Sequence, residues 1–123
     1  MQPEGNIWGT IATQLDGIEI IYDEPNVRSR ILGKPEGTFL IYQGDDNTEE
    51  NPYTIYAVKF SRRAGKNIVI PASIFYNSAD KTFTVMGKGD YAPSYPTLRA
   101  LIEGNDSFLQ HHYTKTPPGY INF

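Results

Sequence analysis

The stretch of sequence that decides the fold is GKPEGTFLIYQ, residues 33–43. Its second half, Thr38–Gln43, is a nearly continuous apolar run, which is typical of a strand covered on both faces. A helical pattern precedes it over Glu24–Leu32, which Asp23 can cap and Gly33 can end. The apolar stripe of this helix consists of Val27, Ile31 and Leu32. A helix that leads into a doubly covered strand indicates a layered fold.

Three further strands are predicted downstream of this stretch. The segment Tyr53–Phe60 is rich in β-branched and aromatic residues, which favour strands. Asn67–Phe75 has the same character but contains Pro71. Because proline has no N–H to donate, this strand should lie at the edge of a sheet. Lys81–Val85 is a shorter fourth strand.

A second helix is predicted over Pro96–Glu103, with Ser94 as its cap and Gly104 at its end. The spacing of its apolar residues gives it one buried stripe. The members of this stripe are Leu98, Leu101 and Ile102. The order of elements predicts the α+β class, with a central antiparallel sheet flanked by two helices.

The two ends of the chain add to this central pattern. Ile7–Leu15 and Ile18–Tyr22 have strand patterns on either side of the dipeptide Asp16-Gly17. Asp-Gly between apolar runs favours a tight hairpin, because both turn positions take a positive φ. We therefore expect an extra hairpin at residues 12–22. Residues 114–123 contain two prolines and little pattern, which predicts an extended tail.

Length and composition exclude several classes of function. A chain of 123 residues is the usual size of one domain, so we expect a single domain over 1–123. It has no cysteine, which excludes thiolate metal sites and a cysteine nucleophile. The net charge of −3 argues against nucleic-acid binding, and no apolar run is long enough to span a membrane. Residues 1–5 have neither a basic flank nor an apolar core, so we expect no signal peptide and a cytoplasmic protein.

Several strings of the sequence resemble the Src homology 2 domain, the family of modules that bind phosphotyrosine peptides. Residues 37–42, GTFLIY, are similar to the family's Gly-Thr-Phe-Leu-Val-Arg strand. The other matching strings are Trp8–Ile11, Tyr53–Val58, Ile68–Ile74 and Tyr95–Ile102. The resemblance is clearest over residues 26–103. It implies a Src homology 2-like fold and a signalling role as a protein-interaction module, which binds a protein or peptide without catalysis or a cofactor.

The resemblance also locates the family's phosphate pocket, but the residues that hold phosphate there are missing. The family's strand ends in an arginine that grips phosphate with two charge-assisted hydrogen bonds. The matching residue here is Tyr42, whose phenol has one donor and no charge. The following loop, 44–51, carries four carboxylates, which repel a dianion. By resemblance, the pocket positions are Pro25, Tyr42, Gly44, Pro71 and Ser73.

Two alternatives follow for the function. In the first, the chain reads phosphotyrosine through a rebuilt pocket with basic residues from the first helix or from the turn near residues 59–66. The candidate ligands are Arg28, Arg30, Lys59, Arg62, Arg63 and Lys66. In the second, which we favour, Tyr42 and Ser73 fill a lost pocket and binding does not depend on phosphate. In either case, the resemblance implies an apolar pocket for peptide specificity at Ala72, Tyr91 and Ile102.

No motif indicates a metal site or an active site. The acidic loop around Asp45–Glu50 lacks the sixth-position glycine and the terminal glutamate of a calcium loop. His111 and His112 are adjacent, so on a strand they point to opposite faces and do not readily share a metal. The sequence has neither a phosphate-binding loop nor a nucleophile elbow. We therefore expect neither a metal nor an enzymatic activity.

Overall fold

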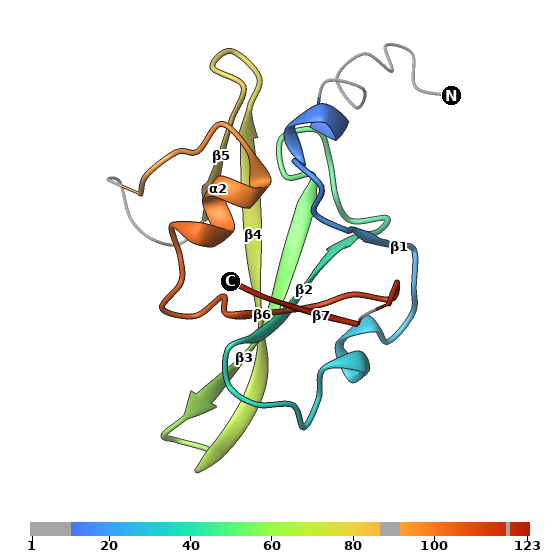
Figure 1. Ribbon diagram of the computed structural model, residues 1–123, viewed down its shortest axis with the longest axis vertical. Helices are drawn as coiled ribbons and strands as arrows, with labels where there is room; N and C mark the ends of the chain where they lie inside the picture. Colours follow the sequence, from blue (N-terminus) through green and yellow to red (C-terminus); the bar gives the residue numbers. More distant parts are fainter. Residues whose placement is uncertain (1–10, 87–91, 118) are drawn as a thin grey trace.

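The computed structural model describes residues 11–86, 92–117 and 119–123, and it has the mixed α+β composition that the sequence predicts (Figure 1). The elements in chain order are β1 (Ile21–Tyr22), the 3-10 helix η1 (Val27–Arg30), β2 (Thr38–Gln43), β3 (Tyr53–Ser61), β4 (Lys66–Asn77), β5 (Thr82–Val85), α2 (Leu98–Glu103), β6 (His111–Tyr113) and β7 (Tyr120–Asn122). Residues 11–14 are also helical. None of the described helices is long and apolar enough to cross a membrane.

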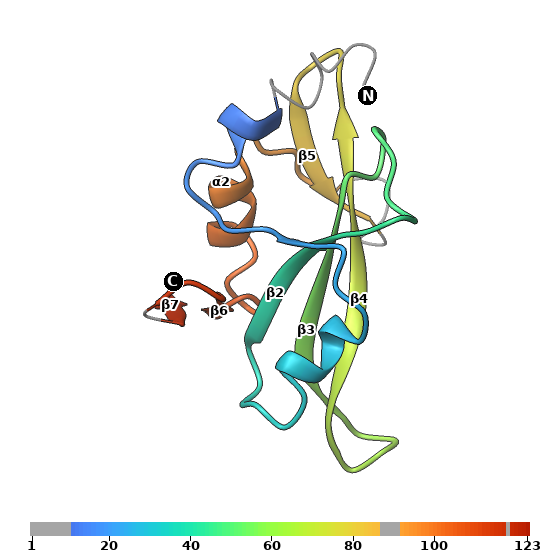
Figure 2. The same ribbon diagram turned by 90° about the vertical axis from the view of Figure 1, so that its right-hand side faces the viewer.

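The described strands form one sheet in the order β5-β4-β3-β2-β6-β7, and β1 pairs with β2 outside this path. Neighbours from β2 to β5 are antiparallel, as expected. β1 and β6 run parallel to β2 and share the edge of β2 that faces away from β3. β6 pairs with the start of β2, and β1 pairs with its end. The sheet is therefore antiparallel at its centre, where β2, β3 and β4 lie side by side (Figure 2), and it gains parallel neighbours from the two ends of the chain.

The strand β2 separates two apolar cores, because alternate side chains leave a strand on opposite faces. Phe39 and Ile41 belong to the larger core, whereas Leu40 belongs to the smaller one, and all three are completely buried. The larger core includes Ile55, Ile74, Phe83, Leu98, Leu101 and Ile102. The smaller core includes Val27, Ile31, Val58 and Val69. The side chains of β2 are therefore buried on both of its faces, so the predicted double covering of this strand is confirmed, whereas two full helices that flank the sheet stay a prediction.

The first helix is much shorter than the expected Glu24–Leu32. Only Val27–Arg30 is helical, and it is a 3-10 turn. Asn26, which precedes it, has φ 56°, and Asp23 has φ 48°. Left-handed conformations at these two residues interrupt a helix. Asp23 is therefore not the N-cap that the pattern predicted, and no α-helix begins at Glu24. As a result Leu32 lies beyond the helix and is 66% exposed, although the pattern placed it in the buried stripe.

The second helix also begins later than expected, because its cap is Thr97 and not Ser94. Thr97 has extended backbone angles, and its hydroxyl accepts a hydrogen bond of 3.0 Å from the backbone N–H of Ala100. This is the usual geometry of a helix N-cap. The Ser94 hydroxyl instead lies 2.9 Å from the hydroxyl of Thr84. Gly104 ends the helix as predicted.

The hairpin expected at residues 12–22 is not formed. Residues 11–14 are helical, and Ile21–Tyr22 pairs with β2 in parallel instead of folding back on a preceding strand. Asp16 and Gly17 do have positive φ angles, 55° and 81°, as the hairpin signal requires. Residues 16 and 17 therefore have the backbone angles expected of a hairpin turn. They follow a helical segment instead of a strand, and they lead the chain toward β1.

The expected tail is extended but also paired. Residues 120–122 form β7, which lies antiparallel to β6, and Phe123 packs against the larger core. The backbone N–H of Phe123 donates to the carbonyl of Gln110 at 2.9 Å. The tail is thus part of the sheet, and the sequence pattern predicted neither β6 nor β7.

The sequence predicts that the strand with Pro71 lies at the edge of the sheet, but β4 lies between β3 and β5, so this prediction is wrong for the strand as a whole. β5 pairs only with residues 74–77 of β4. Pro71 is therefore opposite Tyr56 of β3 on one side and beyond the end of β5 on the other. The proline stands where β4 has no second partner strand among the described residues, which is where a missing N–H costs least.

Candidate functional site

Three of the predicted phosphate-pocket positions lie together on the face of the sheet that carries the smaller core. Tyr42 of β2 is opposite Thr54 of β3, and Thr54 is opposite Ser73 of β4. The next row consists of Leu40, Tyr56 and Pro71. Directly opposite residues share a face, so Tyr42, Pro71 and Ser73 line one surface, and the phosphate pocket at these positions stays a prediction.

Tyr42 occupies the space next to Gly44. A methyl group added to Gly44 would lie 2.5 Å from the Tyr42 hydroxyl and 2.6 Å from its ring, so the phenol packs directly on the glycine. The ring also lies 6.2 Å from that of Tyr56. Partial burial, followed by the nearby charge of Asp23, raises the pKa of Tyr42, while the backbone N–H of Glu24 donates to its hydroxyl. Tyr42 is therefore a neutral, packed side chain at the position that the resemblance matches to the family's arginine.

Pro25 contributes no polar contact to this surface. It is exposed and lies in the irregular segment between β1 and η1. Its neighbour Glu24 contacts Tyr42 through the backbone, as described above, and turns its carboxylate toward Arg30. Pro25, a pocket position by resemblance, therefore carries no charge, and the polar contact of this segment to Tyr42 comes from its neighbour Glu24.

The acidic loop, residues 44–51, is held by hydrogen bonds within itself. The Asn47 side chain accepts from the backbone N–H of Gly44 at 2.8 Å and donates to the carbonyl of Asn51 at 3.0 Å. The N–H of Asn47 donates to Gly44, and that of Thr48 donates to Asn51. The N–H of Asn51 in turn donates to the Thr48 hydroxyl. Four backbone N–H groups of this loop therefore donate to acceptors within it and are not available to a phosphate.

The charges around this loop also disfavour an anion. A hollow of about 400 Å³ lies beside Gly44, and it is lined by one carboxylate, Asp23, and by no lysine or arginine. The four carboxylates of the loop, Asp45, Asp46, Glu49 and Glu50, are exposed. A dianion placed here would meet only charges of its own sign, which weakens its binding even where salt screens part of the repulsion.

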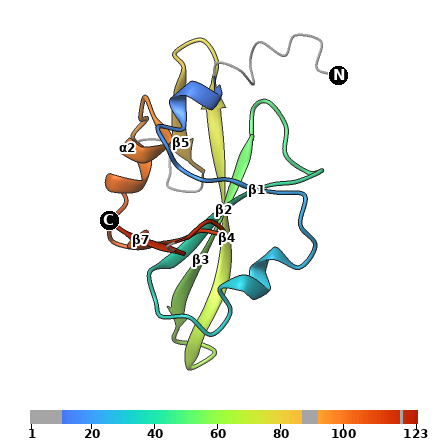
Figure 3. The same cartoon turned by 45° about the vertical axis from the view of Figure 1, so that its right-hand side comes forward.

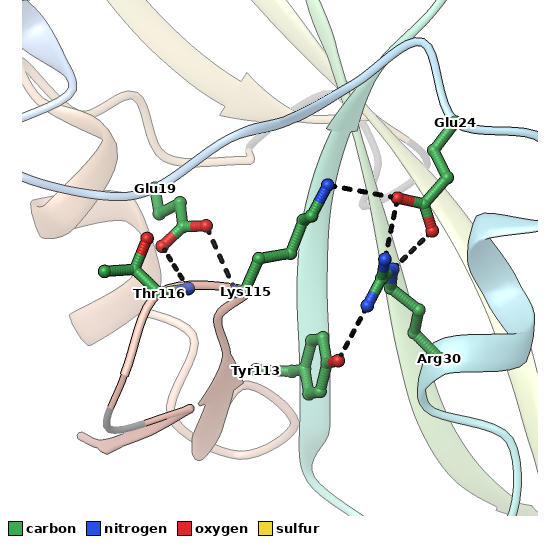
Figure 4. Close-up of polar contacts among 6 residues, drawn as sticks. All are labelled: Glu19, Glu24, Arg30, Tyr113, Lys115 and Thr116. Atoms are coloured by element: carbon green, nitrogen blue, oxygen red, sulfur yellow. Dashed lines mark hydrogen bonds and ion pairs between the residues drawn. The ribbon is translucent and has the colours of Figure 1, made fainter.

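Arg30 is engaged in an ionic network with Glu24 and Tyr113 (Figure 4). Its guanidinium donates two hydrogen bonds to the carboxylate of Glu24, one of them 3.0 Å long, and a third of 3.0 Å to the hydroxyl of Tyr113. The Lys115 ammonium lies 3.4 Å from the same carboxylate. The hydrogen bond from Arg30 is the main cause that lowers the pKa of Glu24. Arg30 therefore ties η1 to the C-terminal segment.

The remaining cations of the β3–β4 turn are dispersed. The ammonium of Lys59 lies 6.0 Å from the ring of Phe108, and its register on β3 places it on the opposite face from Tyr56. Arg62 and Arg63 are exposed at the tip of the hairpin. These three side chains do not converge on one point with Tyr42, so the turn does not supply a compact phosphate site.

Arg28 and Lys66, in contrast, line the same groove. This groove, about 610 Å³ in volume, separates residues 28–33 from the first part of β4, and we call it the η1–β4 groove. Its lining consists of Arg28, Ser29, Leu32, Gly33, Lys66, Asn67, Ile68 and Val69. The Arg28 guanidinium donates to the Val69 carbonyl at 2.8 Å and lies 5.6 Å from the ring centre of Tyr56. Sequence patterns did not indicate Leu32, Tyr56 or Val69 as site residues. Leu32 and Val69 line the groove, and Tyr56 and Val69 contact Arg28, only because η1 ends early.

The proposed specificity pocket is only partly described. Ile102 is completely buried in the larger core, and Ala72 packs against that core. Tyr91 lies outside the described residues. Because Ile102 has no exposed surface, its side chain is a core residue and is not accessible to a peptide in this structure. The apolar pocket at these three positions stays a prediction.

His111 and His112 point to opposite faces of β6, as predicted. His112 is 1% exposed and its ring stacks on Phe39 with centroids 5.0 Å apart. His111 is half-buried, and its Nδ1 lies 2.7 Å from the side-chain oxygen of Asn122. Within residues 11–86, 92–117 and 119–123, no group of three or more histidine, aspartate or glutamate residues is arranged to hold a metal ion. Comparison of the chain with protein-family models and with curated proteins finds no match.

Proposed function

We propose that this chain is a non-catalytic protein-interaction module with a Src homology 2-like fold, and that it binds its protein or peptide partner without requiring phosphate. The observation that carries the proposal is the position of Tyr42, whose ring packs on Gly44 where the family's arginine would stand. A phenol at this position has no charge and cannot form the two parallel hydrogen bonds of a guanidinium.

The order of elements supports the family assignment. The antiparallel strands β2, β3 and β4 follow η1, and α2 follows β5, which is the order that the resemblance implies. Both helical elements are short, so this support rests on the strands and on the two cores at the faces of β2. A role in signalling and a cytoplasmic location remain predictions from the sequence.

The acidic loop supports the phosphate-independent mechanism. Four of its backbone N–H groups donate within the loop, and the adjacent hollow is lined by a carboxylate. A phosphotyrosine would therefore lose hydration without gaining the charged hydrogen bonds that compensate for it. An unphosphorylated peptide avoids this cost.

The proposal is tested by fluorescence polarisation with a randomised tyrosine-containing peptide library and its phosphorylated copy. We expect the unphosphorylated library to bind at least as tightly as the phosphorylated one. Tyr42→Phe should behave as wild type, and Tyr42→Arg should not create phosphate-dependent binding, because four N–H groups of the loop donate within it and its four carboxylates repel a dianion. Tighter, salt-sensitive binding of the phosphorylated library would overturn the proposal. Turnover of generic phosphatase, esterase or peptidase substrates would overturn its non-catalytic part.

One observation favours the second candidate, a phosphotyrosine reader with a rebuilt pocket. Arg28 lies on the ring of Tyr56, one row from Tyr42 on the same face, and it is exposed. If the phosphorylated library binds more tightly in the experiment above, Arg28→Ala should abolish the difference between the two libraries. Arg30→Ala serves as its comparison, because the network in Figure 4 occupies that guanidinium.

A further inference from the structure

The η1–β4 groove combines an uncompensated positive charge with an apolar floor. We propose that it binds an acidic segment of a partner protein, in which carboxylate side chains flank an apolar one. This inference rests on the proposed function, because it names the partner chemistry and the surface of a phosphate-independent module. The groove is distinct from the Tyr42 surface, since its lining comes from residues 28–33 and 66–69.

The charge of the groove is the first argument. Its lining contains Arg28 and Lys66 and no aspartate or glutamate. In the part of the chain that the structure describes, the ion pairs of lysine and arginine involve Arg30, Arg99 and Lys115, so the two cations of the groove are not paired with carboxylates. A chain whose net charge is −3 thus exposes a local surface of opposite sign. An acidic partner is complementary to that surface.

Arg28 is also held in place before any partner arrives. Its guanidinium donates to the carbonyl of Val69 and lies over the ring of Tyr56. A guanidinium has five N–H donors, and the bond to Val69 leaves others for a carboxylate. A side chain that is already ordered loses less conformational entropy on binding. Arg28 is therefore suited to a hydrogen-bonded carboxylate contact.

The apolar part of the groove comes from Leu32 and from the strand beneath it. Leu32 is 66% exposed, which is high for a leucine, and it lines the groove together with Ile68 and Val69. An apolar side chain of the partner would cover this exposed surface. Because Arg28 and Lys66 line the same groove as these apolar residues, the complementary segment carries carboxylates beside its apolar side chain.

The partner should bind through its side chains and not as an added strand. The Val69 carbonyl, which an added strand would use as an acceptor, already accepts from Arg28. Pro71, two residues further on the same edge, has no N–H to donate. Strand addition at this edge would therefore lose two of its backbone hydrogen bonds, whereas the side-chain groove beside it remains available.

The acidic loop of the same molecule does not neutralise the groove. The loop precedes β3, whereas Lys66 lies near the turn that follows this nine-residue strand, which Figure 3 shows at the other end of the sheet from the loop. The strand is about 27 Å long, which exceeds the screening length of about 8 Å at physiological salt. The Lys66 end of the groove is thus electrostatically separate from the four carboxylates, whereas Arg28, over the ring of Tyr56, lies closer to them.

The test uses three fluorescein-labelled dodecapeptides that share one apolar pattern and carry glutamate, glutamine or lysine at their polar positions. We expect the glutamate peptide to bind the full chain most tightly and to weaken with salt. The double variant Arg28→Gln, Lys66→Gln should lower its affinity by about tenfold or more. The matched control Arg62→Gln, Arg63→Gln removes the same charge from the hairpin tip and should lower it by less than about threefold. The change at Arg28 also removes its hydrogen bond to the Val69 carbonyl. The single variant Lys66→Glu, at an exposed position, keeps that hydrogen bond and tests the charge of the groove alone.

The outcomes separate this inference from the function on which it rests. Equal losses in the two double variants, or equal binding of the glutamate and glutamine peptides, would overturn the groove assignment and leave phosphate-independent binding intact. A dimer in sedimentation analysis that is lost on Lys66→Glu would assign the groove to a second copy and overturn the acidic partner. If only phosphotyrosine peptides bind, the proposed function itself fails. Retained binding in Lys66→Glu at wild-type affinity would also count against the groove.

Discussion

The phenol of Tyr42 packs on the Cα of Gly44 and fills the space that a side chain at position 44 would need. A methyl group added to Gly44 would lie 2.5 Å from the Tyr42 hydroxyl, which is closer than real Cβ atoms approach. The φ angle of Gly44 is not in the positive range, so the constraint on this glycine is steric and comes from Tyr42.

Gly44→Ala should therefore destabilise the fold by about 1–3 kcal/mol, the usual cost of overpacking. In a Tyr42→Ala background the same change should cost much less, because the phenol is no longer present. Urea denaturation of the four chains in this double-mutant cycle measures the coupling. If the two changes are additive, the packing of Tyr42 on Gly44 is not what restricts this position.

The second prediction concerns the Asn47 side chain. It makes hydrogen bonds to Gly44, Asn51 and Thr54, at 2.8, 3.0 and 3.2 Å. Asn47→Ala should lower the free energy of unfolding by about 1–3 kcal/mol, because it leaves partly buried backbone groups without partners. Asp46→Ala, a change at an exposed neighbour, should stay within about 0.5 kcal/mol of wild type. Equal effects of the two changes would show that Asn47 does not organise the loop.

The third prediction is a dependence of stability on pH that originates at His112. Burial against Phe39 lowers the pKa of this imidazole from 6.5 to about 4. Between these values the unfolded chain binds a proton that the folded chain does not, so the free energy of unfolding falls as the pH falls from about 6.5 to about 4. The loss reaches about 3 kcal/mol at the low end of the window.

Chemical denaturation at a series of pH values measures this effect. His112→Phe should remove most of the slope in that window, since a phenyl ring can still stack on Phe39 but cannot be protonated. His111→Gln is the matched control at the adjacent, half-buried position, and it should retain the slope. An unchanged slope in His112→Phe would assign the pH dependence to other groups.

The fourth prediction concerns the attachment of the C-terminal segment. The carboxylate of Glu19 accepts from the backbone N–H groups of Lys115 and Thr116, at 3.1 and 3.4 Å (Figure 4). Glu19→Ala should accelerate hydrogen exchange at these two amides by about tenfold, since a hydrogen bond to a charged group contributes about 1.5 kcal/mol. Glu24→Gln removes the ion pair with the Lys115 ammonium but keeps both amide contacts, so it should change the exchange much less. The reverse order of effects would place the attachment at Glu24.

The long strands could be predicted from the sequence because their signal is local. β2 has the bounds expected from its apolar run, Thr38–Gln43. β3 ends one residue later than Tyr53–Phe60, and β4 extends Asn67–Phe75 by one residue at its start and two at its end. A strand of this length buries enough β-branched and aromatic surface for its pattern to dominate other influences.

The helices and the ends of the chain depended on information that the local pattern lacks. Asn26 takes a left-handed conformation that shortens η1, although its neighbours fit a helix. The register Thr38↔His111 creates β6 by pairing segments far apart in the chain, and no property of a three-residue segment predicts such a partner. For the candidate site, the sequence predicted the loss of charge at Tyr42 but not its packing on Gly44, nor the groove that unites Arg28 with Lys66.

The pairing of the C-terminal segment with the first part of the chain has a consequence for the kinetics of folding. Glu19 contacts residues 96 and 97 positions later, and β6 completes one edge of the central strand. Contacts of this separation require a large loop to close before they stabilise anything, so they slow folding. On the ribosome, the edge of β2 beside β3 can pair early, whereas the edge beside β6 must wait until residue 113 has emerged. During that interval the start of this edge of β2 is unpaired, because β1 covers only its end, and an unpaired strand edge favours aggregation.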